Sequence, residues 1–279
     1  NWSRALLVTS VCMKLAAVPL FFWLLRLADE VPSLVLGVII AVIDMAAFGE
    51  LWTAAQANPA LLAPTGLWLG VAAVTSLVAA LLMLSQRSLK RLLVLSTVED
   101  VGFLLLGAAS ITALGAEGAM LGAATHALAK ALLFASLSAP EAAGDLDADR
   151  TSLVSRYPVS AFAFLLGMLA MIGVPPTLGF LDRWRLYETA LRIGPAWLLV
   201  FVFSSALALI AYAMALARIW WGPPAPEPTL DAGNTPPPRP AERAAEPLAL
   251  RAVLAGLVAL LLLAGLWPAV LHAVQWGKP

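Results

Sequence analysis

Eight stretches of about 20 mostly apolar residues constrain this chain more than any other feature of its sequence. They cover residues 5–27, 32–54, 66–85, 91–109, 116–138, 157–176, 196–220 and 249–271. A helix of about 20 apolar residues crosses the hydrocarbon core of a bilayer, so each stretch predicts one membrane span. Charged residues make up only 12% of the chain, about half of what a soluble domain carries. We therefore expect an all-α, polytopic membrane bundle of about eight transmembrane helices.

Two of these spans contain proline and are predicted to be broken helices. Pro19 lies within the first span, and the sixth span runs into Gly173-Val174-Pro175-Pro176. Proline removes a backbone donor and kinks or ends a helix. A break inside the membrane is tolerated only where protein or water satisfies the freed backbone groups, and such breaks are typical of transport sites. Residues 178–190 are expected to form the second half of the sixth helix.

Polar stretches divide the chain into three parts: a transmembrane core over 1–221, a Pro-rich linker over 222–248 and a C-terminal transmembrane helix within 249–279. With eight spans both termini lie on one side. The other side receives most of the basic loop residues, namely Arg26, Arg87, Lys90, Arg91, Arg150, Arg156, Arg218, Arg239, Arg243 and Arg251. Because basic loops stay in the cytoplasm, we expect cytoplasmic long loops and external termini in the cell inner (plasma) membrane.

Several ionisable residues lie near the middle of predicted spans, among them Lys14 in the first, Asp44 in the second, and His126 and Lys130 in the fifth. A charge inside the bilayer costs free energy, so it is usually paired, hydrated or functional. The spacing of four places His126 and Lys130 on one helical face. Low dielectric disfavours the ammonium form of a lysine, while a nearby carboxylate favours it, so such groups suit proton transfer. The alternatives are a structural pairing of the lysines with Asp44 or a neighbouring subunit, and a hydrogen-bonded bundle histidine.

Further charges lie at possible helix breaks. Glu99 and Asp100 interrupt the fourth apolar stretch, and they are expected either to take part in proton transfer or to face water at a polar break. Asp182 and Arg183 follow the Pro175-Pro176 break. The Arg183 side chain either belongs to the same proton pathway or extends to the membrane interface.

Other chemistries find little support in the sequence. The single cysteine, Cys12, excludes an intrachain disulfide, and two histidines are too few for a metal or haem centre of the usual kind. Phosphate-binding and nucleophile-elbow motifs are absent from the sequence. The zero net charge gives no reason to expect a nucleic-acid partner. We therefore expect no cofactor.

Four motifs, in order along nearly the whole chain, resemble the antiporter-like subunits of respiratory complex I (NADH-quinone oxidoreductase). They also resemble the related subunits of membrane-bound hydrogenases and multisubunit sodium/proton antiporters. The motifs are Lys14-Leu-Ala-Ala-Val-Pro-Leu-Phe-Phe-Trp23, Lys90-Arg-Leu-Leu-Val-Leu-Ser-Thr97, His126-Ala-Leu-Ala-Lys-Ala-Leu-Leu-Phe134 and Gly173-Val-Pro-Pro-Thr-Leu-Gly-Phe180-Leu-Asp-Arg183. The third motif is the closest to the family pattern.

The resemblance implies that the chain covers the seventh to fourteenth helices of this family. It implies proton translocation driven by redox chemistry elsewhere in a complex, with other membrane subunits and the lipid bilayer as partners. Lys14 would be the switching lysine, Lys130 with His126 would form the central relay, and Arg183 would take the terminal lysine's position. Asp44 stands where many relatives carry a lysine. The lysine's glutamate partner is expected in a preceding segment, since the chain begins without Met.

Three hypotheses remain open. The leading one is a proton-translocating subunit, or its C-terminal half, within a complex I-like assembly. The second is a subunit of a cation/proton antiporter or an inorganic-carbon uptake complex, where sodium is the other possible ion. The third is a non-conducting scaffold subunit, which the replacement of a titratable lysine by Arg183 favours because arginine does not release its proton at accessible pH.

Overall fold

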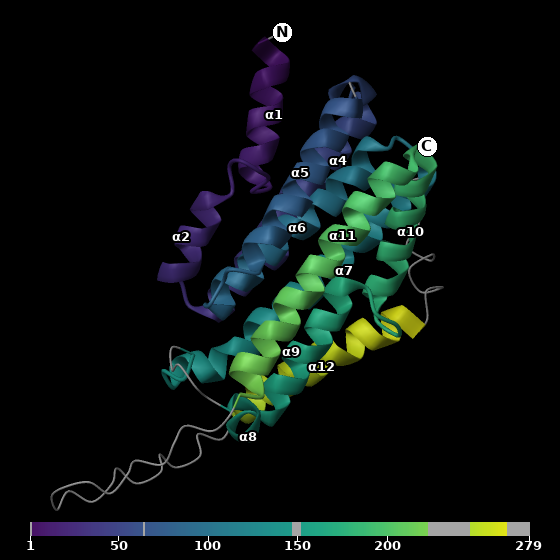
Figure 1. Ribbon diagram of the computed structural model, residues 1–279. Coiled ribbons are helices and arrows are strands. Elements are labelled where there is room, and N and C mark those ends of the chain that lie inside the picture. Colours follow the sequence, from purple (N-terminus) through teal and green to yellow (C-terminus); the bar gives the residue numbers. More distant parts are fainter. Residues whose placement is uncertain (1, 64, 147–151, 223–245, 267–279) are drawn as a thin grey trace, which may run out of the picture.

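The computed structural model describes residues 2–63, 65–146, 152–222 and 246–266 (Figure 1). Helices are the regular structure throughout these residues, which confirms the all-α prediction. Six continuous helical runs are long and apolar enough to cross a membrane. They are α3–η1–α4 (Ser33–Val38, Ile39–Asp44, Met45–Ala57), α5 (Thr65–Met83), α6 (Leu89–Ala109), α7 (Ala113–Ala142), α11–η3 (Pro195–Ala215, Leu216–Trp220) and α12 (Leu248–Leu266).

Two further crossings are interrupted, as the prolines predicted. The first consists of α1 (Trp2–Lys14) and α2 (Phe22–Glu30), with Pro19 in the segment between them. The second consists of α9 (Pro158–Ile172) and α10 (Leu178–Ile193). Gly173 ends α9 with a φ of +85°, a left-handed conformation that glycine adopts without strain. Among the described residues the structure thus shows six helical runs long enough to cross a membrane, and these two broken helices occupy the places of the first and sixth predicted spans.

Local sequence signals set several helix boundaries. Ser88 and Thr112 precede α6 and α7, and their hydroxyl groups accept hydrogen bonds from the backbone N–H groups of Arg91 and Gly115. Such caps satisfy donors that the first turn of a helix leaves without partners. The short helices η2 (Pro59–Leu61) and α8 (Leu153–Arg156) lie in the connections. The α-helix of the second crossing widens into a π-helix at η1, which the sequence did not predict.

Helix α6 lies at the centre of the bundle. Nearly all its residues from Leu92 to Ala109 are buried, and it packs mainly against α5 and α7. The expected interruption at Glu99 and Asp100 is wrong: α6 is continuous there, and both side chains are buried in protein instead of facing water. Glu99 and Asp100 need no water-exposed helix break because the side chains of His126 and Arg183 pair with them inside the bundle.

Helices α1 and α2 lie along one side of the bundle, while α12 runs across the other side, against α7, α9 and α10 (Figure 1). Of the predicted linker over 222–248, residues 223–245 lie outside the described part of the chain, as do residues 267–271 of the last predicted span. Glu246 follows the undescribed segment and accepts hydrogen bonds from the backbone of Val159 and Ser160, which begin α9. This contact ties the start of α12 to the start of α9.

Candidate functional site

A cluster of ionisable side chains lies in the interior of the bundle. It is formed by Asp44, Glu99, Asp100, His126, Lys130, Asp182 and Arg183, which we call the buried charge cluster. These residues come from η1, α6, α7 and α10, so four segments distant in sequence converge on one place. Their relative exposure is 7% or less in every case. Charges so deeply buried are costly unless they are paired or used.

His126 connects two carboxyl groups. Its Nδ1 atom lies 2.7 Å from Oδ2 of Asp100, and its Nε2 atom lies 3.8 Å from Oδ2 of Asp44. The first distance is a hydrogen bond, whereas the second requires a bridging water or a small side-chain movement. Because an imidazole has a separate donor or acceptor site on each nitrogen, it can take a proton on one side and release it on the other.

Arg183 closes the other end of this row. Its Nη2 atom lies 2.6 Å from Oδ1 of Asp100 and 3.3 Å from Oε2 of Glu99. The guanidinium group also donates to the backbone oxygen of Met171 at 2.9 Å and lies over the ring of Phe103. The expected alternative, an arginine that extends to the membrane interface, is therefore wrong: the side chain points into the bundle because two buried carboxylates hold it there.

Lys130 occupies a polar pocket beside this row. Its Nζ atom donates to the backbone oxygen of Leu93 at 2.8 Å and to the hydroxyl group of Ser96. The Tyr212 hydroxyl donates to the same Ser96 oxygen, 2.7 Å away. Among the described residues no carboxylate lies within 4 Å of this amine. The proposed pairing of Lys130 with Asp44 is thus not a direct contact, and neutral groups hold the lysine instead.

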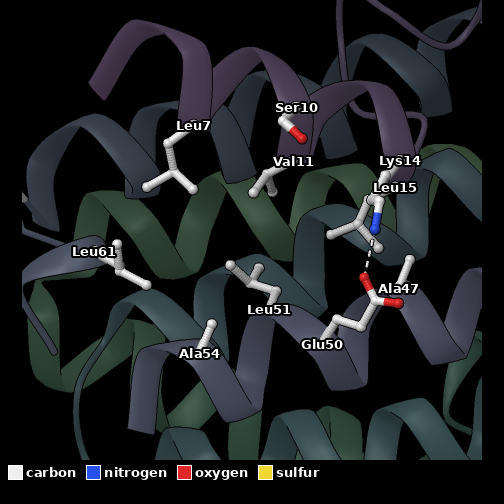
Figure 2. Close-up of a pocket in the computed structure, with 10 residues that line it drawn as sticks. All are labelled: Leu7, Ser10, Val11, Lys14, Leu15, Ala47, Glu50, Leu51, Ala54 and Leu61. Atoms are coloured by element: carbon white, nitrogen blue, oxygen red, sulfur yellow. Dashed lines mark hydrogen bonds and ion pairs between the residues drawn. The ribbon is translucent and has the colours of Figure 1, made fainter. Parts of the chain in front are cut away.

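Lys14 departs from the sequence prediction. It was expected to lie inside the first span, with a structural pairing to Asp44 as one alternative. Its side chain is instead 58% exposed and forms an ion pair with Glu50 on α4 (Figure 2). The reason is the end of α1 at Lys14, which leaves the lysine at the surface of the described bundle beside α4. Glu50 is thus a carboxylate partner of Lys14 among the described residues, while the glutamate expected in a preceding segment stays a prediction.

Close packing of glycine residues lets the charged helices approach each other. A side-chain carbon at Gly179 would lie 1.8 Å from the Ala170 backbone oxygen, so α10 can begin against the end of α9 only with glycine there. A side-chain carbon at Gly173 would lie 2.6 Å from the Arg183 side chain. The glycines of the broken helix therefore allow Asp182 and Arg183 to lie in the core. This is how the fourth sequence motif, residues 173–183, contributes to the site.

Several polar atoms of the buried charge cluster have no hydrogen-bond partner among the described residues. They are Asp44 Oδ2, Glu99 Oε1, His126 Nε2, Asp182 Oδ2 and Arg183 Nη1. Buried polar atoms are normally satisfied, and exceptions point to water, ions or function. The described residues contain no group of three His, Cys, Asp or Glu side chains arranged to hold a metal ion. Spare hydrogen-bonding capacity among titratable groups is what proton transfer through water requires.

Sequence reasoning found most of the ionisable residues but missed Glu50, Ser96 and Tyr212 as members of the site. Glu50 carried a usable signal, because a carboxylate in the apolar sequence Ala47-Phe-Gly-Glu50-Leu-Trp52 is as unusual as Asp44. Ser96 and Tyr212 carried none, since serine and tyrosine are common in membrane helices and only their position beside Lys130 marks them.

The chain is similar to known protein families and solved structures over most of its length. Residues 1–208 match the transmembrane family described as NADH:quinone oxidoreductase/Mrp antiporter. The chain is 33% identical over 216 residues to NADH-quinone oxidoreductase subunit N of Desulforudis audaxviator, covering 74% of this chain and 42% of the relative. It is 32% identical over 248 residues to hydrogenase-4 component B of Escherichia coli, covering 76% of this chain and 36% of the relative.

Solved structures show the same fold. A chain of respiratory complex I from Thermus thermophilus superimposes with a TM-score of 0.73 at 25% identity, over 97% of this chain and 58% of the other. A chain of the Mrp complex from Dietzia has a TM-score of 0.84 at 22% identity, over 96% and 57%. The chain spans less than half the length of the curated relatives named here.

Proposed function

Because this chain belongs to the NADH:quinone oxidoreductase/Mrp antiporter transmembrane family, we propose that it is a proton-translocating membrane subunit of a complex I-like NADH-quinone oxidoreductase assembly. The observation that carries this proposal is the row Asp44–His126–Asp100 in the bundle interior. Two carboxyl groups flank one imidazole, at 3.8 Å and 2.7 Å. A proton accepted at one ring nitrogen and released from the other would advance along this row.

The balance of charge in the buried charge cluster supports labile protons. Asp44, Glu99, Asp100 and Asp182 are four carboxyl groups, whereas Lys130 and Arg183 are two bases. Uncompensated buried charge is costly, and burial shifts such groups toward their neutral forms. The excess carboxyl groups and the imidazole would therefore hold protons, and these are the protons that the pathway would move.

Each residue of the pathway has a role that its surroundings suggest. His126 would exchange protons between Asp44 and Asp100. Lys130 would be a second titratable site, held by Ser96 and separated from direct carboxylate contact. Arg183 keeps its proton, so it would act as a fixed positive charge that stabilises the anionic form of Asp100 and Glu99 instead of relaying protons itself.

We propose the cytoplasmic side for the end of the bundle that carries the basic connections. Lys90, Arg91 and Arg156 all lie at or beside these connections, where they pair with Glu141, Asp29 and Asp145. An excess of basic residues marks cytoplasmic loops, and eight crossings would put the chain's two ends on the opposite, external side of the inner (plasma) membrane. The division into a 1–221 core, a linker and a C-terminal helix stays a prediction.

The test is substitution of Lys130 by Ala in the full-length subunit within its native membrane complex. We expect proton translocation to be abolished while NADH-quinone electron transfer falls or becomes uncoupled. Translocation is measured by a pH-sensitive dye in sealed vesicles, and electron transfer by NADH oxidation. The matched control is Arg192→Ala, which removes an exposed base paired with Glu188 and should leave both rates unchanged. Normal pumping by the Lys130→Ala complex would refute the proposal.

A further inference from the structure

The Lys14–Glu50 ion pair lies in a hollow between α1 and α4 (Figure 2). The hollow has a volume of about 240 Å³ and is lined mostly by apolar side chains, including Leu7, Val11 and Leu51. The two charged side chains are 58% and 66% exposed. An ion pair facing hydrocarbon would be costly, so in the membrane this hollow must admit water or be covered by protein. In both cases the pair is more than a surface contact.

A second, smaller cavity is lined by Lys14 together with the buried Asp44. It has room for about one water molecule, with a volume of about 20 Å³, and is lined by Lys14, Asp44, Ile40 and Ile43 among others. Lys14 lines both cavities, the first together with Glu50 and the second together with Asp44. Oδ2 of Asp44 has no hydrogen-bond partner among the described residues and lies 3.8 Å from His126.

An exposed ion pair contributes little to stability, typically about 0–1 kcal/mol. Stabilising the contact between α1 and α4 therefore does not explain well why two charged side chains lie in an apolar hollow. Proton transfer is a better explanation. Glu50 pairs with Lys14, Lys14 and Asp44 line one water-sized cavity, and Asp44 lies 3.8 Å from His126 in the row.

We propose that Glu50 is the outer carboxyl group of a proton-exchange site and that Lys14 links it to Asp44. This inference rests on the proposed function. The Lys14 ammonium gives one proton, through a water molecule, to the Asp44 carboxylate and becomes a neutral amine. With the ammonium charge gone, the Glu50 carboxylate takes one proton from water in the hollow and passes it to the Lys14 amine, which restores the ion pair. One proton moves inward in each cycle, only bonds to hydrogen change, and no electrons are exchanged.

The first test compares Glu50→Gln, Glu50→Asp and wild type in the full-length subunit within its native complex. Glu50→Gln keeps the size of the side chain but cannot exchange a proton, so translocation should fall by on the order of tenfold or more. Glu50→Asp keeps the carboxyl group and should restore part of the rate, which a purely structural role of the side chain would not predict. The control is Glu188→Gln, which breaks another exposed ion pair, that with Arg192, and should pump normally.

The second test leaves both charges in place and fills the hollow. Ala54 lines it, so Ala54→Phe should exclude water and lower translocation, whereas Ala57→Phe, on the same helix but outside the hollow, should not. Full translocation in both Glu50→Gln and Ala54→Phe, with loss in Lys130→Ala, would overturn this inference and leave the proposed function standing. Full translocation in Lys130→Ala would refute the proposed function itself.

Discussion

Nη2 of Arg183 lies 2.6 Å from Oδ1 of Asp100, whose other oxygen pairs with Nδ1 of His126 at 2.7 Å. A single carboxylate thus stands between a permanent cation and a titratable imidazole. Asp100 accepts a hydrogen bond from the Arg183 guanidinium with one oxygen and pairs with the His126 ring through the other. Because three helices meet at this carboxylate, α6, α7 and α10 are fixed relative to one another by the same contacts that order the proposed pathway.

Removal of the Arg183 guanidinium should destabilise the bundle more than removal of an exposed arginine. Arg183→Ala would leave Glu99 and Asp100 without their buried counter-charge, and breaking such a pair costs about 3–5 kcal/mol. Arg183→Lys keeps the charge but loses part of the contacts to Asp100, Glu99 and Met171, so its loss should be smaller. Thermal unfolding of the purified complex in detergent measures the difference.

The control for this prediction is Arg185→Ala, two residues along the same helix. Arg185 pairs with Glu117 at the surface, with side-chain exposures of 29% and 38%, and such pairs contribute about 0–1 kcal/mol. Equal destabilisation by Arg183→Ala and Arg185→Ala would mean that the buried contacts of Arg183 do not hold the helices together.

Gly265 of α12 should tolerate no larger side chain. A side-chain carbon there would lie 2.1 Å from the backbone oxygen of Pro176, in the break between α9 and α10. Gly265→Val would push α12 away from this break, and overpacking of this kind costs about 1–3 kcal/mol. Since α10 carries Arg183, we expect a lower unfolding temperature together with reduced proton translocation.

Gly256 provides the matched control on the same helix. A side-chain carbon at Gly256 meets nothing within 4 Å among the described residues, so Gly256→Val makes the same change of helix propensity without a clash. If Gly256→Val and Gly265→Val lower the unfolding temperature equally, the contact of α12 with the break is not what matters.

The helices and the broken spans could be predicted from the sequence because each depends on local patterns. The length of each apolar stretch predicts a membrane span, and Pro19 and Pro175-Pro176 predict where two of the helices are broken. His126 and Lys130 were also predictable as buried partners on one face, since a spacing of four fixes their relative direction on α7. These features need no knowledge of what packs against them.

The partners of the charges could not be predicted, since they depend on how the helices are arranged. Nothing local places Arg183 beside Asp100 instead of at the interface, or Lys14 beside Glu50 instead of Asp44. The burial of α6 is likewise a property of the bundle. Two acids in an apolar stretch suggested a polar break because burying unpaired carboxylates costs free energy. Arg183 and His126, which pair with these carboxyl groups, come from other helices and cannot be identified as partners from the local sequence.

Tyr212 is the member of the site least predictable from local sequence, and its substitution separates the support of Lys130 from general packing. The Tyr212 hydroxyl donates to Ser96, 2.7 Å away, and Ser96 in turn accepts from Lys130. Tyr212→Phe removes only this hydroxyl, so stability should fall by about 0.5–1.5 kcal/mol while the lysine amine loses part of its fixed surroundings. We expect proton translocation to decrease in vesicles although the complex assembles normally.

Tyr187→Phe is the comparison that decides this prediction. The Tyr187 hydroxyl also donates to a serine, Ser205, at 2.7 Å, so the two substitutions remove the same kind of hydrogen bond, one next to Lys130 and one not. A loss of stability in both variants with a loss of translocation only in Tyr212→Phe would assign the hydroxyl a positioning role at the lysine. Equal translocation by the two variants would mean that Ser96 and Leu93 alone suffice to hold the Lys130 amine where it can exchange a proton.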